Sequence, residues 1–204
     1  MYFDFCEVAP LMTNCYLIGD ETVCAVVDPG GSPERVLAMV EKSGLQPVMI
    51  LVTHGHYDHV RGIPGLLEKY PDLPIYIHEK ELCEAEAWSK RFWLPHQGAN
   101  QRTYAEGDTL ALGTLTVKVM ETPGHSAGSV VLLVEDFMLS GDTLFAGACG
   151  RWDLPGSDGG DMLASLARLG RLEGDYKVCP GHGGLSTLKR EQAANMYMRQ
   201  ALEQ

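Results

Sequence analysis

The chain has 204 residues, of which 45% are hydrophobic and 21% are charged, as in an ordinary globular protein. Its net charge of −11 argues against nucleic-acid binding, which needs a basic face. No apolar run approaches the length of a membrane span, so we expect neither nucleic acid nor a membrane among its partners. A chain of this length predicts one domain, residues 1–204, with a substantial hydrophobic core.

The N-terminal part of the chain predicts strands followed by a helix. Ser32 is expected to cap this helix, with Pro33 in its first turn and Gly44 ending it. Strand-like runs cover residues 2–8, 14–19 and 22–28, and the helix is predicted to run to residue 43.

An apolar run at 48–52 predicts a buried strand, and it leads directly into three histidines and a carboxylate. Imidazole and carboxylate are the ligands that Zn²⁺ and Fe²⁺ accept in sites open to substrate. His54 and His56 stand two apart in an extended segment, so both can point toward one ion. Asp58 and His59 follow a reversal of the chain and can reach a second ion.

The remainder of the chain alternates between strand-like and helical patterns. This alternation predicts an α/β layered domain. The predicted helices are 63–69, 79–88, 160–172 and 187–202, the predicted strands are 73–78 and several between 109 and 140, and 89–106 is expected to be irregular.

Three more candidate ligands stand in settings like that of the first group. His125, Asp142 and His182 each follow a strand-like run, with glycine or proline at the exit of the strand. Ligands at the ends of several strands converge on one edge of a sheet, which is a usual position for functional sites. The sequence therefore predicts one convergent set of metal ligands.

This arrangement resembles the metallo-β-lactamase superfamily along nearly the whole chain. The resemblance implies an α/β fold of the αββα type, a four-layer sandwich that holds two metal ions. The motifs that carry it are Asp28-Pro-Gly-Gly31, Thr53-His-Gly-His-Tyr-Asp-His59, Thr122-Pro-Gly-His125, Gly141-Asp-Thr143 and Pro180-Gly-His182.

The resemblance also implies which residues bind each metal ion. Asp142 would bridge the two ions, and Asp58 would both bind metal and orient a metal-bound hydroxide. Zinc is the metal expected first, with iron or manganese as alternatives. One ion would take His54, His56 and His125, and the other would take Asp58, His59 and His182.

Within the superfamily, the strings 141–151 and 180–187 look like the glyoxalase II-like branch. That likeness implies a thioester hydrolase acting on a small acylated thiol. Larger enzymes of this branch hold glutathione partly with a C-terminal helical domain, whereas here one helix is predicted beyond His182. We therefore expect no separate C-terminal substrate domain, and the thiol carrier stays open.

Three other functions remain open on the same scaffold. A persulfide dioxygenase would hold one Fe²⁺ with His54 or His56, together with His125 and Asp142. A lactonase would use the same metals as the thioesterase. A metal-binding module without turnover is the non-enzymatic alternative. An exported β-lactamase is disfavoured, because such enzymes generally lack a carboxylate like Asp142.

Several residues near these motifs have two interpretations. Asp28 either orients a ligand histidine or forms a turn. Arg151 is expected to pair with Asp153 and fix the loop after Asp142, rather than to bind substrate. Cys149 either packs or lines the pocket.

The other histidines and cysteines suggest less specific roles. His78 is expected to be a surface or capping residue, and His96, beside aromatic residues, either packs or faces the pocket. The cysteines show no C-x-x-C pair and are expected to be reduced thiols of a cytoplasmic protein. They are Cys6, Cys15, Cys24, Cys83, Cys149 and Cys179.

Overall fold

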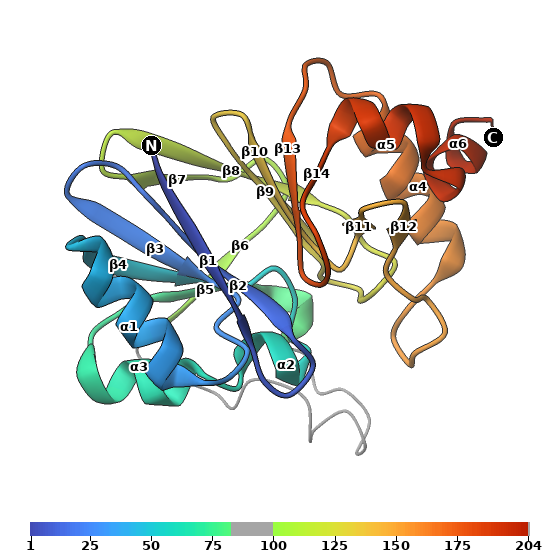
Figure 1. The fold of residues 1–204 in the computed structure, drawn as a ribbon. Helices are drawn as coiled ribbons and strands as arrows, with labels where there is room; N and C mark the ends of the chain where they lie inside the picture. The colour runs from blue at the N-terminus through green and yellow to red at the C-terminus, as the bar shows by residue number, and fades with distance from the viewer. Residues whose placement is uncertain (83–99, 204) are drawn as a thin grey trace.

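A computed structural model describes residues 1–82 and 100–203, and two six-stranded sheets organise them. The first sheet has the order β1-β2-β3-β4-β5-β6 (Figure 1). Its strands pair antiparallel from β1 to β3 and parallel from β3 to β6. They are β1 (Tyr2–Val8), β2 (Thr13–Gly19), β3 (Val23–Val27), β4 (Gln46–Leu51), β5 (Ile75–His78) and β6 (Gln101–Tyr104).

The second sheet has the order β14-β13-β10-β9-β8-β7, with one parallel pair between β10 and β13. A small hairpin, β11 (Leu144–Phe145) and β12 (Ala148–Cys149), follows β10 in the chain. The strands of the second sheet are β7 (Thr109–Leu112), β8 (Leu115–Glu121), β9 (Val130–Val134), β10 (Phe137–Gly141), β13 (Lys177–Pro180) and β14 (Ser186–Thr187).

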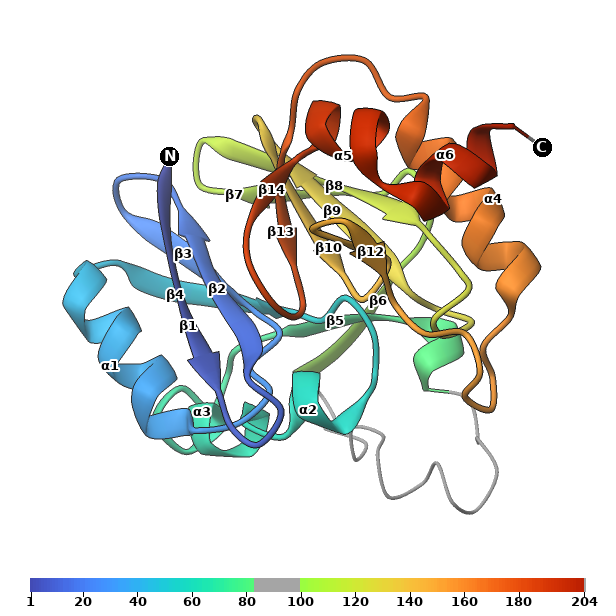
Figure 2. The same cartoon turned by 45° about the vertical axis from the view of Figure 1, so that its right-hand side comes forward.

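Helices cover the outer face of each sheet, which gives the predicted αββα sandwich (Figures 1 and 2). On the first sheet lie α1 (Pro33–Ser43) and α3 (Ile63–Lys69). On the second lie α4 (Gly159–Gly170), α5 (Leu188–Ala194) and α6 (Met196–Leu202). The short α2 (Tyr57–Val60) lies at the ends of the strands, and η1 (Glu79–Glu81) follows β5.

The core has one layer between the sheets and one beneath each helical face. The alternation of buried and exposed residues in β8 turns Leu115, Val117 and Val119 toward the first sheet. They meet side chains such as Ile18 and Leu51, so both sheets are held at a fixed separation. None of the helices in the described residues has the length and apolar character that crossing a membrane requires.

The structure corrects three predictions about secondary structure. Residues 101–104 form β6 although 89–106 was expected to be irregular, because this polar edge strand pairs in parallel with β5. The predicted helix 187–202 is two helices, separated at Asn195, whose side chain caps α6. Ser32 does not cap α1 through its side chain; its hydroxyl accepts a hydrogen bond from the amide of Ala9. Most of the predicted helix 79–88 lies outside the described residues.

The packing between the sheets leads to a prediction about the stability of the fold. Leu132 on β9 is fully buried in it, and Leu132→Ala should lower the free energy of unfolding of the metal-free protein by about 2–5 kcal/mol through lost contacts and a residual cavity. Chemical denaturation measures this change. Lys118→Ala, on the exposed face of the neighbouring β8, should change it by less than about 0.5 kcal/mol. Equal effects of the two substitutions would contradict this packing.

Candidate metal centre

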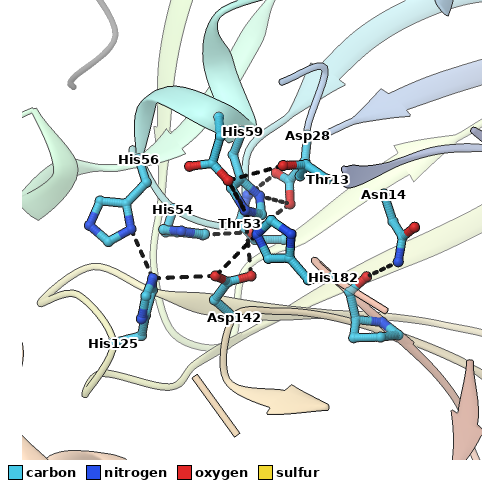
Figure 3. A network of polar contacts seen from close by, with 12 residues as sticks. Thr13, Asn14, Asp28, Thr53, His54, His56, His59, His125, Asp142 and His182 are labelled. Carbon is cyan, nitrogen blue, oxygen red and sulfur yellow. Dashed lines mark hydrogen bonds and ion pairs between the residues drawn. The ribbon is translucent and has the colours of Figure 1, made fainter. Parts of the chain in front are cut away.

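All seven predicted ligands lie close together at one edge of the sandwich, and Figure 3 labels the six of them other than Asp58. They come from four segments that leave strands at the same edge. His54 and His56 follow β4, and Asp58 and His59 lie in α2. The other three, His125, Asp142 and His182, follow β8, β10 and β13 of the second sheet.

The first group of ligands consists of three histidines. Ligand atoms of His54, His56 and His125 all lie within 4.8 Å of one another. Nε2 of His125 is 2.8 Å from Nδ1 of His56, a hydrogen bond that a cation bound between them would replace. Nδ1 of His125 donates to the carbonyl oxygen of Arg151 at 2.8 Å, which directs Nε2 toward the other two histidines.

The second group combines a carboxylate with two histidines. Ligand atoms of Asp58, His59 and His182 also lie within 4.8 Å of one another. Oδ2 of Asp58 is 3.2 Å from Nε2 of His182 and 3.6 Å from Nε2 of His59. Ligand atoms of His54, His59 and Asp142 form a further set within 4.8 Å of one another, which connects the two groups.

Asp142 lies between the two groups. Its Oδ1 is 3.4 Å from Nε2 of His59, and its Oδ2 is 3.5 Å from Nε2 of His125 and 3.6 Å from Nε2 of His182. One carboxylate therefore faces a histidine of the first group and two of the second, as the bridging position requires.

These separations fit ligands of a common cation. Two ligand atoms at about 2.0–2.2 Å from one tetrahedral ion lie about 3.3–3.6 Å apart. The carboxylate–imidazole contacts of 3.2–3.6 Å span that range, whereas a normal hydrogen bond is shorter.

Three of the atoms that could bind a metal ion are buried and lack a hydrogen-bond partner, which also fits a metal site. Among the described side chains, Nε2 of His54, Nε2 of His59 and Oδ1 of Asp142 are buried and make no hydrogen bond. Such atoms destabilise a fold unless something binds them. A Cβ on Gly181 would lie 2.1 Å from Oδ1 of Asp142, so glycine keeps the space between the ligands open.

The charges of the metal-free site already favour a cation at its centre. Burial lowers the pKa of His59, but the carboxylates of Asp142 and Asp28 outweigh burial and raise it well above the usual range. Burial likewise raises the pKa of Asp142, but the charge of His59 leaves it lowered. By contrast, burial lowers the pKa of His56 to about 4, so this imidazole is neutral at pH 7.

Asp28 makes the contact expected of an orienting residue. Its Oδ2 accepts a hydrogen bond from Nδ1 of His59 at 2.9 Å, which directs Nε2 of that ring toward the ligands. The carboxylate also accepts from the amide and the hydroxyl of Thr53, each at 2.7 Å. Asp28 has a φ of 50°, so it forms the turn as well, and both interpretations hold.

Three residues of β2 that support the site were not predicted. The hydroxyl of Thr13 donates to Oδ2 of Asp58 at 3.0 Å. Nδ2 of Asn14 donates to the carbonyl oxygens of Pro180 and Gly183, on either side of His182. Tyr16 donates to the same oxygen of Pro180 at 2.7 Å. The sequence offers only polar residues in or beside the predicted strand 14–19, and the structure shows that β2 is buried throughout.

The other candidate residues lie around this centre. Arg151 pairs with Asp153 through two contacts of 2.6 and 2.8 Å, as predicted. Cys149 lines a cavity of about 280 Å³ with Arg151, Trp152 and Tyr197, and burial raises its pKa to about 11, so it is a neutral thiol.

His78 caps η1, as one alternative predicted, but it is buried rather than at the surface, because Nε2 contacts Glu121 at 2.9 Å. His96 lies outside the described residues.

Comparison with known proteins identifies the family. The model of the metallo-β-lactamase superfamily matches residues 8–182, and the chain belongs to this superfamily of metal-dependent hydrolases. A curated relative, the hydroxyacylglutathione hydrolase GloC of Haemophilus influenzae, is 31% identical over 209 residues, which cover 97% of this chain and 98% of that protein.

Solved structures agree in fold. The B3 metallo-β-lactamase BLEG-1 is 32% identical, with a TM-score of 0.86 over 97% of this chain and 99% of that one. The protein TTHA1623 in a di-iron-bound form is 36% identical, with a TM-score of 0.80 over 95% of this chain and 99% of that one.

The protonation of the site predicts how metal affinity depends on pH. The pKa of His59 is raised well above its usual range; burial lowers the pKa of His182, but its hydrogen bond with Asp58 leaves it raised, so Zn²⁺ competes with protons for both rings. The affinity for Zn²⁺ should therefore fall as the pH is lowered from 8 to 6, by about tenfold per pH unit for each proton displaced. Calorimetric titration in buffers of different ionisation enthalpy measures the protons released. Binding that releases none would contradict these protonation states.

Proposed function

We propose that this chain is a binuclear metal-dependent hydrolase that cleaves a small thioester with water as the nucleophile. The observation that carries the proposal is the convergence of seven ligand side chains in two groups around Asp142. Two ions are proposed, zinc first, with iron or manganese as alternatives. The 31% identity to a hydroxyacylglutathione hydrolase over nearly the whole chain supports a thioester as substrate.

The assignment of ligands follows the two groups. His54, His56 and His125 would hold one ion, and Asp58, His59 and His182 the other. Asp142 would hold both, because its two oxygens face different groups. Two divalent ions at this edge would lower the pKa of a water molecule toward about 7 and polarise the scissile carbonyl group.

The side chains of the site have separate tasks in this reaction. Asp58, besides holding metal, would accept a hydrogen bond from the attacking water and so orient it. The hydroxyl of Thr13 donates a hydrogen bond to Oδ2 of Asp58 and so fixes the orientation of this carboxylate. Asp28 fixes the ring of His59 and thereby the second group. The reaction requires no serine or cysteine nucleophile, and the neutral thiol of Cys149 agrees with this.

The second group separates this proposal from its main alternative. A persulfide dioxygenase would need one Fe²⁺, held by His54 or His56 with His125 and Asp142, and would leave Asp58, His59 and His182 without a cation. Those three are held in place by Thr13, Asp28 and Asn14, which supports a second ion. The di-iron form of TTHA1623 leaves iron open as the metal of a binuclear site.

We also propose that the protein acts in the cytoplasm. Five cysteines lie in the described residues and all are free thiols, which suits a reducing compartment.

Removal of ligands tests the metal site. His56→Ala and Asp142→Ala should each reduce bound metal and hydrolysis together, while circular dichroism shows that both sheets still form. Loss of a residue that only hydrogen-bonds a metal ligand lowers metal affinity or activity by about 10- to 100-fold. Loss of a ligand itself should therefore lower both by at least about 100-fold. Asp136→Ala removes an exposed carboxylate that pairs with Lys177 and should change neither metal content nor rate. Normal activity in either ligand variant would refute the assignment.

A substrate panel, run with metal analysis, tests the reaction. We expect two ions per chain, and thioesters of several small thiols should be hydrolysed with higher kcat/KM than lactones or β-lactams. Oxygen consumption with persulfides should be absent. One iron per chain with persulfide oxidation would replace the proposal with the dioxygenase, and preference for a lactone or β-lactam would keep the metal site and change the substrate.

A further inference from the structure

A buried carboxylate that the proposed reaction does not use connects two loops of the site. Glu81 is 1% exposed and lies in η1, directly after β5. Its Oε2 accepts the amide hydrogen of Gly55 at 2.6 Å, and its Oε1 accepts that of Gly128 at 2.7 Å. Gly55 stands between His54 and His56, and Gly128 lies three residues after His125. One carboxylate thus joins the loops that carry all three histidines of the first group.

Among the described residues, these two loops also meet where Nε2 of His125 lies 2.8 Å from Nδ1 of His56, and through one backbone hydrogen bond. The carbonyl oxygen of Thr53 accepts the amide hydrogen of Val130, one backbone bond where both loops meet their strands. Within residues 126–129, the amide hydrogen of Ser126 is donated to the hydroxyl of Ser129, a hydrogen bond inside one loop. Glu81 therefore holds the backbones of both loops together from outside them, beyond Thr53.

The surroundings of Glu81 fix its own position. Nδ1 of His78 accepts the amide hydrogen of Lys80 and caps the turn, while Nε2 contacts Glu121 at 2.9 Å. On the other side, a Cβ on Gly128 would lie 2.7 Å from Oε1 of Glu81 and 2.9 Å from Nδ1 of His78. The loop can approach the carboxylate this closely only because residue 128 is glycine.

We propose that Glu81 is a positioning residue for the first metal ion: by holding Gly55 and Gly128 it sets the separation of His54 and His56 from His125. This inference rests on the proposed metal-dependent hydrolysis. Glu81 would act on the three-histidine group alone. The second group is held instead by Thr13, Asn14 and Asp28, which lie in β2 and directly after β3.

Glu81→Gln tests this role with a change of similar shape. Glutamine offers one carbonyl oxygen, so one amide of the pair would face an NH₂ group instead of an acceptor. The loops should separate, and affinity for one Zn²⁺ should fall by about 10- to 100-fold, with the other affinity within about threefold of wild type. Competition with a chromophoric chelator resolves the two affinities without reference to activity. Gly128→Ala should weaken the same ion, because its methyl group displaces the carboxylate.

Glu191→Gln is the matched control. Glu191 is also 1% exposed and also accepts a glycine amide, that of Gly147 at 2.7 Å, but it contacts neither loop of the first group. This variant should lower the unfolding midpoint of the metal-free protein as Glu81→Gln does, while both Zn²⁺ affinities stay near those of wild type.

A double-mutant comparison identifies which ion is affected. In a His56→Ala background the first group is already broken, so adding Glu81→Gln should leave the remaining Zn²⁺ affinity unchanged. The inference is wrong if Glu81→Gln binds both ions as wild type does, if it weakens both equally, or if Glu191→Gln reproduces its effect. A wild-type protein that binds no Zn²⁺, Fe²⁺ or Mn²⁺ would instead overturn the proposed function, and the inference with it.

Discussion

The structure depends on holding seven polar side chains close together, out of water and without a full set of hydrogen-bond partners. Burying an imidazole or a carboxylate in this way costs free energy unless another group compensates. The protein supplies part of this compensation: Nδ1 of His59 lies 2.9 Å from Asp28 and its Nε2 3.4 Å from Asp142, whereas Nε2 of His54 has no partner among the described residues. The proposed pair of divalent cations would supply the partner that these ligand atoms lack. One edge of the fold therefore brings together the side chains that the proposed metal ions would bind.

The two sheets hold different parts of this arrangement in place. The first sheet supports the group of Asp58, His59 and His182 directly, through side chains of β2 and the turn after β3. It supports the three-histidine group indirectly, through the turn after β5 and the backbone of Gly55 and Gly128. The second sheet supplies the ends of β8, β10 and β13. Since the apolar layer between the sheets fixes their separation, it also fixes the distance between ligands that are more than a hundred residues apart.

Strand ends and the convergence of the candidate ligands could be predicted from the sequence because each rests on a local pattern: an apolar run followed by glycine or proline and a histidine or aspartate. The sequence predicts one helix over 187–202 where the protein has two, because the apolar spacing continues across Asn195. The capping role of Asn195 depends on local geometry. Residues such as Asn14 and Glu81 could not be found this way. Their partners are backbone groups 166 and 26 residues distant, and no local pattern records such contacts. The role of His96, which lies outside the described residues, stays a prediction.

Element-specific anomalous diffraction from crystals of the metal-loaded protein tests the central claim most directly. The account predicts two peaks about 3.5–4 Å apart, one among His54, His56 and His125 and one among Asp58, His59 and His182, with Asp142 contacting both. A single peak, or peaks away from these side chains, would contradict it.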